Sequence, residues 1–269
     1  MRFDLSGKVA VITGGGGILC STIAEALARE GVRCVILDIA EDKAKRTLEL
    51  VRKAGSDGLA LATNVLKRDE LERAAEETLK AFLRVDFLIN GAGGNHPRAT
   101  TSEEVSFFDL PEDAVRFVFD LNFMGTFLAS QVFGKLMAER KEGVILNIAS
   151  MNAIRPLTRI PAYSAAKAAV ANFTQWLAVH MAREYSPGIR VVSIAPGFFL
   201  TEQNRYLLMD ERGNLTERGK RIIEHTPMGR FGEPEDLVGA VIWLLSPAAS
   251  FVTGVVIPID GGFSAYSGV

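Results

Sequence analysis

The sequence predicts an α/β fold built on one doubly wound, seven-stranded parallel sheet with helices on both faces. Short runs of β-branched and other apolar residues alternate with longer helical patterns along the 269 residues, and this alternation implies right-handed βαβ units. Most of the short runs are apolar throughout, which is typical of strands buried on both faces of a sheet. No repeat, low-complexity segment or linker interrupts the pattern, so we expect a single domain over residues 1–269.

The expected elements follow one another in the order that this fold requires. Strands are predicted where Val, Ile, Leu or Ala dominate a short run, at 8–13, 33–38, 58–63, 85–90, 143–150, 189–195 and 254–260. Helices are predicted between them, at 21–31, 41–54, 67–83, about 112–139 and about 161–185. The first helix is expected to end at Gly31, and the second carries its charges on one side, as a helix that covers a sheet does.

Two segments, 91–111 and 196–233, are longer than the usual connections of an α/β sheet. Each follows the carboxyl end of a predicted strand, where open α/β sheets form their ligand crevice. The segments are either surface insertions or the walls of a substrate pocket. Because neither is of low complexity and long loops of ordinary composition are usually functional, we favour the pocket.

Composition argues against several classes of protein. A net charge of -2 gives no electrostatic basis for binding nucleic acid or an anionic membrane. No uncharged apolar stretch is long enough for a membrane span, and the first residues lack the apolar run of a signal peptide. Cys20 and Cys34 fit a reduced, cytoplasmic protein, and three histidines without a cluster argue against zinc or another metal.

The stretch "TGGGGILC", residues 13–20, lies between the first predicted strand and the first predicted helix. At this position, backbone N–H groups and a helix N-terminus can bind a pyrophosphate. Asp38 ends the second strand, where a carboxylate accepts hydrogen bonds from both ribose hydroxyls and repels a 2′-phosphate. Asp38 also suits the N-cap of the next helix, a compatible role. Together these features predict a dinucleotide-binding Rossmann fold that prefers NAD to NADP.

A reaction centre is predicted at "YSAAK", which places Tyr163 and Lys167 four residues apart on one face of a helix. A ketone reductase or alcohol dehydrogenase needs a general acid/base at the substrate oxygen. Free tyrosine has a pKa of about 10, and we expect the Lys167 ammonium to lower it. By itself, such a pair is as consistent with a solvent-exposed helix face as with a reaction centre. Ser150 strengthens the case, because its hydroxyl can hydrogen-bond and orient the substrate oxygen.

These residues, in this order, with "NGAG" at 90–93 and "APG" at 195–197, resemble the short-chain dehydrogenase/reductase family over essentially the whole chain. The resemblance implies an oxidoreductase with four catalytic residues, Asn122, Ser150, Tyr163 and Lys167. It implies that Asn122 binds a water molecule that links Lys167 to solvent. Asn122 is also consistent with a buried amide whose hydrogen bonds are all made within the protein. The expected cofactor contacts are Gly14, Gly17, Ile18, Asp38, Asn64, Val65, Asn90, Ala92, Tyr163, Lys167, Pro196, Gly197 and Thr201. Asn64 is equally suited to an Asx-turn.

The glycine loop departs from the family pattern, which reads Thr-Gly, any three residues, Gly, any residue, Gly. Thr13 and Gly14 match, but Ile18 and Cys20 occupy the two later glycine positions. We expect Gly17 to take over the close approach to phosphate, because glycine adopts conformations that other residues avoid. Cys20 is expected to fill the helix-packing position, and the helix to start about one residue early.

Polar and basic residues cluster in the sequence segments around the predicted centre. The candidate substrate contacts are His96, Arg98, Asn152, Arg155, Asn204 and Arg205. Any one of them is at least as well explained as a surface group, but together they favour a hydroxylated, anionic substrate. An arginine among them can bind a carboxylate through two parallel hydrogen bonds.

The segments "SMNAIRPLTRIPAYSAAKAAV" and "TPMGRFGEPE" resemble the D-mannonate oxidoreductase, or fructuronate reductase, branch of the family. This resemblance implies interconversion of D-fructuronate and D-mannonate with NAD(H), and the family's usual state implies a homotetramer. A gluconate, polyol or 3-oxoacyl reductase on the same scaffold remains an alternative. A catalytically silent NAD-binding sensor is a second alternative, supported only by the unusual glycine loop.

Overall fold

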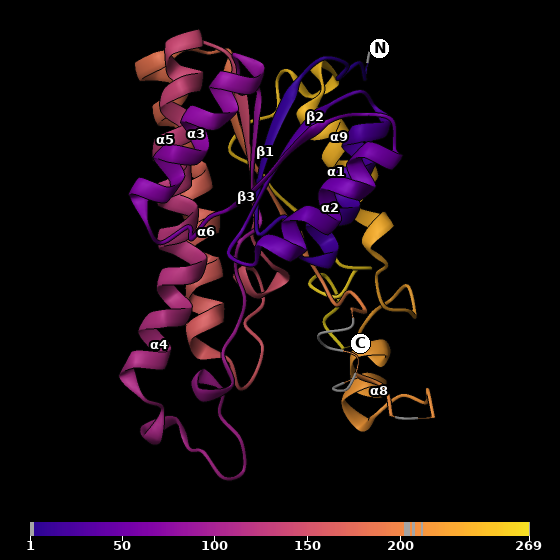
Figure 1. Ribbon diagram of the computed structural model, residues 1–269. Coiled ribbons are helices and arrows are strands. Elements are labelled where there is room, and N and C mark those ends of the chain that lie inside the picture. The colour runs from indigo at the N-terminus through magenta and orange to yellow at the C-terminus, as the bar shows by residue number, and fades with distance from the viewer. Residues whose placement is uncertain (1–2, 202–204, 206–207, 211, 269) are drawn as a thin grey trace.

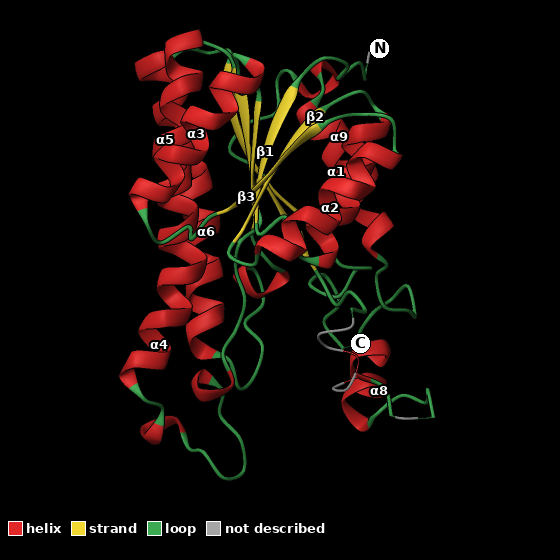
Figure 2. Cartoon of the chain, viewed as in Figure 1, coloured by secondary structure: helices red, strands yellow, loops and turns green. Residues whose placement is uncertain are grey.

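The computed structural model describes residues 3–201, 205, 208–210 and 212–268. It has three layers, with one parallel sheet between two groups of helices (Figure 1, Figure 2). The strands are β1 (Val9–Thr13), β2 (Arg33–Asp38), β3 (Gly58–Ala62), β4 (Phe87–Asn90), β5 (Gly143–Ile148), β6 (Ile189–Pro196) and β7 (Val256–Ile259). Their order is β3-β2-β1-β4-β5-β6-β7. The predicted seven-stranded parallel sheet is therefore confirmed.

The topology places a ligand crevice beside β1, because the strand order reverses between β1 and β4. Thr13, the last residue of β1, pairs with Asn90, the last residue of β4. The glycine loop after β1 and the segment after β4 therefore leave the sheet side by side.

Helices cover both faces of the sheet (Figure 1). One face carries α1 (Ile18–Arg29), α2 (Glu41–Lys53) and α9 (Val238–Leu245), and the other carries α3 (Arg68–Phe82), α4 (Glu112–Phe119), α5 (Gly125–Arg140) and α6 (Pro161–His180). A further helix, α8 (Glu217–Glu224), lies within the long segment 196–233. The 3-10 turns are η1 (Pro97–Ala99), η2 (Phe107–Asp109), η4 (Met151–Ala153), η6 (Pro234–Leu237) and η7 (Pro247–Ala249).

Buried apolar side chains form one large cluster on each face of the sheet. Along β1, Val9 and Val11 belong to the cluster beneath α3 and α5, whereas Ala10 and Ile12 belong to the cluster beneath α1. Successive residues of a strand point to opposite faces, so an entirely apolar strand supplies both clusters. Because these strands are buried on both faces, the positions of their carboxyl ends, which border the crevice, are fixed.

Three helix boundaries differ from the prediction. The first helix spans Ile18–Arg29, not 21–31, because the backbone turns into the helix directly after Gly17. The helix expected over 112–139 is interrupted by a π-helical turn, η3 (Asp120–Met124), between α4 and α5. A second π-helical turn, η5 (Met181–Tyr185), follows α6. Such turns interrupt the i→i+4 ladder and are frequent at functional sites.

Neither membrane-spanning helices nor metal clusters occur in the part of the chain that the structure describes. None of its helices is both long and apolar enough to cross a bilayer. No three His, Cys, Asp or Glu side chains gather there as a metal site would need. Cys20 and Cys34 are both buried and free.

Candidate active site

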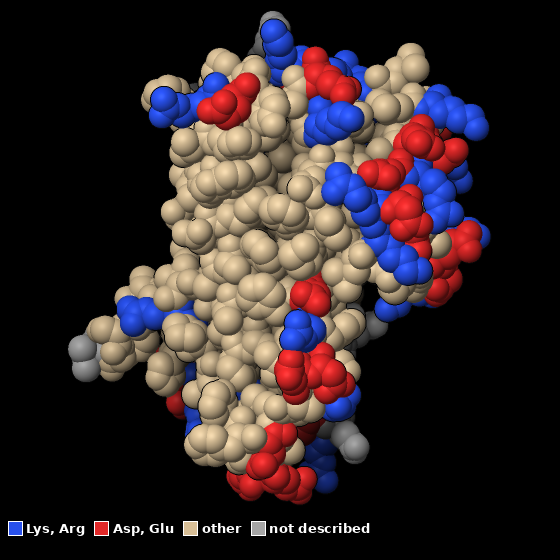
Figure 3. Space-filling view, turned by 90° about the vertical axis from the view of Figure 1, so that its left-hand side faces the viewer, with Lys and Arg blue, Asp and Glu red and all other residues tan. Residues whose placement is uncertain are grey.

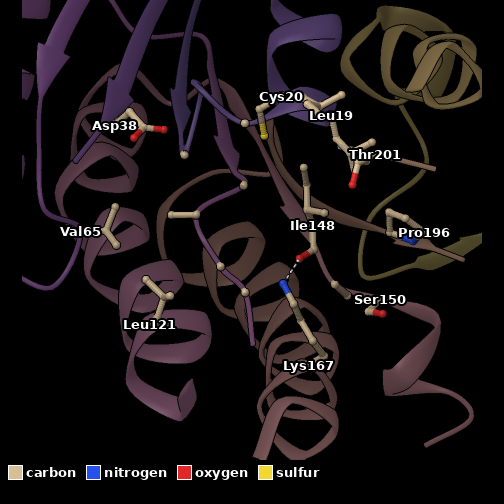
Figure 4. A pocket seen from close by; sticks show the side chains of 18 of the residues that line it. Leu19, Cys20, Asp38, Val65, Leu121, Ile148, Ser150, Lys167, Pro196 and Thr201 are labelled. Atoms are coloured by element: carbon tan, nitrogen blue, oxygen red, sulfur yellow. Dashed lines mark hydrogen bonds between the residues drawn. The ribbon is translucent and has the colours of Figure 1, made fainter. Parts of the chain in front are cut away.

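A cavity of about 500 Å³ opens at the carboxyl ends of the central strands, a volume typical of small-molecule and cofactor sites. All of the predicted cofactor residues line it except Asn90. Asp38 lies at one end of the cavity, and Ser150 and Lys167 lie at the other (Figure 4). The cavity therefore joins the glycine loop to the predicted reaction centre.

The glycine loop packs closely against the segment after β4. Gly14 has a positive φ of 61°, and a Cβ there would lie 2.7 Å from the Cα of Ala92. Gly17 is the N-cap of α1 and donates its N–H to the carbonyl of Gly14 at 3.1 Å. Gly17, Ile18 and the next two residues all line the cavity. The N-terminus of α1 thus opens into it, as binding of a pyrophosphate requires.

Cys20 occupies the place where the family pattern has glycine, and Gly91 compensates for its side chain. A Cβ at Gly91 would lie 2.2 Å from the sulfur of Cys20, so the thiol fills space that Gly91 leaves. The thiol points toward the carbonyl of Thr13, with 3.9 Å between Sγ and O. Burial raises the pKa of Cys20 to about 12, which keeps the thiol neutral and makes it a packing group.

Asp38 organises two loops at the far end of the cavity. Its Oδ2 accepts the N–H of Gly16 at 3.0 Å, and its Oδ1 accepts the N–H of Ala40 at 3.0 Å. Each carboxylate oxygen keeps a further acceptor site for a ribose hydroxyl. The prediction that Asp38 is a helix N-cap is wrong, because α2 begins later and its N-cap is Ala40. Lys43 also lines this end of the cavity.

The two predicted asparagine contacts differ in position. Asn64 lines the cavity, and its Oδ1 accepts the N–H of Leu66 at 3.0 Å, which is the Asx-turn considered above. Asn90 is buried away from the cavity, and its Nδ2 donates to Ser130 and Asn147. The geometry gives Asn90 a structural role between β4 and β5, because its amide is directed into the sheet and α5.

The predicted reaction centre is assembled from the end of β5 and from α6. Ser150, Tyr163 and Lys167 all line the cavity. The Nζ of Lys167 donates to the carbonyl of Ile148 at 2.7 Å, the dashed line in Figure 4. The same nitrogen lies 5.6 Å from the centre of the Tyr163 ring.

The electrostatics of this pair correct one prediction. Burial raises the pKa of Tyr163 above its ordinary value, and a hydrogen bond with Ser150 opposes the shift in part. The lowering that we expected from Lys167 is not found, because its ammonium is directed to Ile148 and lies over the tyrosine ring. Burial lowers the pKa of Lys167 to about 8. The phenol is therefore neutral near pH 7, and the amine is mostly charged.

Asn122 lies in the π-helical turn η3 and is completely buried. Its Oδ1 accepts the N–H of Gly94 at 3.1 Å, and its Nδ2 donates to the carbonyls of Gly94 and Val118, each at 2.7 Å. A Cβ at Gly93 would lie 2.6 Å from this Oδ1 and 3.2 Å from the Nζ of Lys167. The side chain of Asn122 is thus a satisfied core amide that holds the segment after β4 against Lys167.

The predicted substrate contacts do not line the cavity where the structure describes them. The guanidinium of Arg98 forms a bidentate ion pair with Asp113, at 2.8 and 3.0 Å. The backbone N–H of Arg98 donates to the Nδ1 of His96. Arg155 donates its Nε to the carbonyl of Ser264 at 3.1 Å. Arg205 is exposed. Asn204 lies outside the described residues.

Residues 198–199 form an apolar wall of the cavity that we did not predict from the sequence. Phe198 packs edge-on against Phe263, with 5.1 Å between the ring centres, so the C-terminal segment supports this wall. The N–H of Leu200 donates to the carbonyl of Gly232 at 3.0 Å, which folds the long segment 196–233 back on itself. The run "GFFLT" directly after "AP" was the available signal.

Comparison with known proteins agrees with this geometry. A family model described as "Enoyl-(Acyl carrier protein) reductase" matches residues 17–264. The chain belongs to the short-chain dehydrogenase/reductase family. The predictions of an oxidoreductase enzyme and of a Rossmann fold are thereby confirmed.

Three bacterial relatives match almost the whole chain. "Uncharacterized oxidoreductase UxuB" of Bacillus subtilis (strain 168) is 51% identical over 99% of this chain and 98% of its own length. A solved structure from Haemophilus influenza, described as a "putative D-Mannonate oxidoreductase" with bound NAD, is 45% identical, with a TM-score of 0.93 over 99% of this chain and 98% of that one. The 5-keto-D-gluconate 5-reductase of Escherichia coli (strain K12) is 33% identical over 97% of this chain and 96% of its own length.

Proposed function

We propose that this protein is an NAD(H)-dependent oxidoreductase that interconverts a ketone and a secondary alcohol on a sugar acid, with D-fructuronate and D-mannonate as the substrate pair. One observation carries the proposal. Ser150, Tyr163 and Lys167 line one end of a cavity whose other end holds Asp38 and the N-terminus of α1. The relative with bound NAD supports the cofactor.

The cavity fits a dinucleotide at both ends. The close approach of Gly14 to Ala92 and the open N-terminus of α1 provide a cradle that side chains would fill. Asp38 accepts the ribose hydroxyls of the adenosine and repels a 2′-phosphate, so the cofactor is NAD. The ammonium of Lys167 has three donors. One of them is bound to Ile148, and the others hold the ribose of the nicotinamide.

The three side chains divide the work of ketone reduction. When bound, NADH supplies the hydride that the ketone carbon accepts. Ser150 donates a hydrogen bond to the substrate oxygen and orients it. Tyr163 then protonates that oxygen, and its raised pKa suits this role because it keeps the phenol protonated near neutral pH. In the direction of alcohol oxidation, the same groups act in reverse.

The carboxylate of the sugar acid binds to one of the three predicted arginines. Arg98 is the weakest of the three candidates, since both of its terminal nitrogens are bound to Asp113. Among the described residues, Arg155 bonds only through its Nε, to Ser264, which leaves its two terminal nitrogens for a bidentate pair. Arg205 is the third candidate.

A second substrate is favoured by one comparison. The relative from Escherichia coli is a 5-keto-D-gluconate 5-reductase, and that compound is also a six-carbon keto acid. Steady-state oxidation of NADH with D-fructuronate, 5-keto-D-gluconate and a 3-oxoacyl thioester distinguishes the candidates. We expect the highest kcat/KM with D-fructuronate. A higher value with another ketone would reassign the substrate, and no turnover with any ketone would support a silent NAD-binding sensor.

A second copy of the chain is the protein partner that we propose. The middle of the face that α4, α5 and α6 form carries few charges, whereas charged side chains gather at its upper and lower ends (Figure 3). On it, Trp176 is 56% exposed and stacks on His180, whereas Phe173 is buried beneath. A homotetramer would cover this face. Light scattering should give four times the mass of one chain, and a monomer would refute this assembly.

The free, buried cysteines are compatible with a cytoplasmic location.

A further inference from the structure

The hydroxyl of Ser150 lies in a hydrogen-bond network that the family resemblance did not indicate. Ser150 ends the extended segment after β5 and caps the single turn η4. Its Oγ accepts two hydrogen bonds from Asn152, one from the backbone N–H and one from Nδ2, both at 3.2 Å. Both residues are buried, with 7% and 6% of their surface exposed. Solvent therefore does not compete strongly for these bonds.

The orientation of the Asn152 amide is fixed by its other partners. Its Oδ1 accepts the backbone N–H of Leu157 at 3.1 Å and the hydroxyl of Ser164 at 3.0 Å. A backbone N–H can only donate, so the amide oxygen must face Leu157, and the amide nitrogen must face Ser150. One side chain thus joins the end of β5, the loop that follows it and the first turn of α6.

This network restricts what the Ser150 hydroxyl can do. A hydroxyl has one proton to donate and two acceptor sites. Asn152 fills both acceptor sites, so the remaining function of Ser150 is to donate its own proton. A carbonyl oxygen needs a donor of this kind. Ser150 lines the cavity together with Tyr163, which is where a substrate oxygen would accept this proton.

We propose that Asn152 is a positioning residue that makes Ser150 an obligatory hydrogen-bond donor to the substrate oxygen. This inference rests on the proposed function of Ser150 and replaces the earlier prediction that Asn152 contacts substrate. The amide of Asn152 has its oxygen and its nitrogen engaged within the protein. Its effect on substrate therefore passes through the serine hydroxyl.

The substitution Asn152→Asp tests the donor directly. It keeps an oxygen for Leu157 and Ser164 but replaces the donor to Ser150 with an acceptor. The serine proton then turns to the new carboxylate and away from the substrate. We expect kcat for NADH-dependent ketone reduction to fall about 10- to 100-fold, somewhat less than the loss of a complete oxyanion donor. The Kd of NADH, measured by fluorescence titration, should stay within about twofold.

A pH profile separates this role from a purely structural one. Burial raises the pKa of a carboxyl group, and a protonated carboxyl can again donate to Ser150. The ratio of kcat in Asn152→Asp to kcat in the wild type should therefore rise as the pH falls from about 8 to about 5. A ratio that is independent of pH, with a lower melting temperature, would overturn the inference in favour of simple structural damage.

Matched variants complete the test. Ser164→Ala removes the tie to α6 but leaves both bonds to Ser150, so kcat should change less than about twofold. Asn152→Ala keeps the hydrogen bond from the backbone N–H of residue 152 to Ser150, so its kcat should lie between those of Asn152→Asp and Ser164→Ala. This variant provides a second measurement if Asn152→Asp does not fold. Equal losses in Ser164→Ala and Asn152→Ala would contradict the proposed order.

Ser150→Ala distinguishes failure of this inference from failure of the proposed function. Full activity in Ser150→Ala would refute the role of the serine itself. A large loss in Ser150→Ala together with wild-type activity in Asn152→Asp would refute only the positioning role. If Ser150 and Asn152 both have the proposed roles, the double variant that combines Ser150→Ala with Asn152→Asp should lose no more activity than Ser150→Ala alone. The reason is that the two residues act through one hydroxyl.

Discussion

The two ends of the cavity are built differently. At the end that holds Asp38, which we propose as the adenosine end, Gly14 and Gly17 lie in the loop where β1 leaves the sheet. Hydrogen bonds between backbone groups and to the Asp38 carboxylate hold this loop in place. At the substrate end, the walls come from the long segments 91–111 and 196–233. There the charged side chains are exposed and several are paired with one another, as Arg98 is with Asp113.

Element order alone predicts one of these two kinds of site and not the other. A site made of backbone groups at the ends of buried strands follows from the fold, because burial fixes the strands and the strands fix the loops. A site made of long side chains on loops depends on which partners those side chains find.

The largest effect is expected for Tyr163→Phe, which removes the proton donor and keeps the ring. The kcat for ketone reduction should fall by about 1,000-fold or more, within the range of general acid catalysis. The Kd of NADH should change little, because the adenosine end is untouched. Stopped-flow and steady-state measurements with NADH give both values. Turnover close to wild type would remove Tyr163 from the reaction.

A smaller effect is expected for Asp38→Ser, which removes the negative charge beside the ribose. NADH should bind about tenfold more weakly, as expected for loss of hydrogen bonds to a charged group, and NADPH should bind about tenfold more tightly. Lys43 lines this end of the cavity, and we expect it to contact the 2′-phosphate in this variant. Fluorescence titration measures both affinities.

Lys43→Met provides the control for the Asp38 variant. Added to Asp38→Ser, it should abolish most of the gain for NADPH without affecting NADH further. An unchanged preference for NADH in Asp38→Ser would mean that the geometry of the glycine loop, not charge, selects the cofactor.

The third prediction concerns pH. Because the pKa of Lys167 is lowered to about 8, the ammonium is charged below that pH and lost above it. If the ammonium holds the nicotinamide ribose, the affinity for NADH should be constant below about pH 7 and about tenfold lower at pH 9. Lys167→Met should show weak binding with no such dependence. A flat profile in the wild-type protein would contradict the assignment.

The smallest effects are expected at the substrate end. Arg155→Ala should raise KM for the sugar acid about fivefold at nearly constant kcat, since an exposed ion pair is weak. Arg98→Ala, the matched control, should change KM less than about twofold because Asp113 already occupies its guanidinium. A reversal of the two values would show that the Arg98–Asp113 pair opens when substrate binds.

The sequence was sufficient to predict the sheet, the cavity's two ends and the placement of Ser150, Tyr163 and Lys167 on them. Strand burial and helical spacing determine these positions. The sequence was insufficient for Asn90, whose amide turns into the core, and for the pKa of Tyr163, which depends on burial that spacing does not reveal.

The loops were harder still to predict. Arg98 and Arg155 found protein partners, Asp113 and Ser264, and an apolar wall formed where polar contacts were expected. Charge composition does not specify such pairings, because it does not reveal which acid or carbonyl the folded loops bring to each arginine. Even in the glycine loop, the compensation of Cys20 by Gly91 joins the first turn of α1 to the segment after β4, which lie far apart in the sequence.

A crystal structure of the protein with NAD would show whether the cavity binds the cofactor in the proposed direction. We expect the adenosine ribose on Asp38, the pyrophosphate at the N-terminus of α1 and the nicotinamide beside Tyr163 and Lys167. NAD bound in the opposite direction, or outside this cavity, would contradict this expectation.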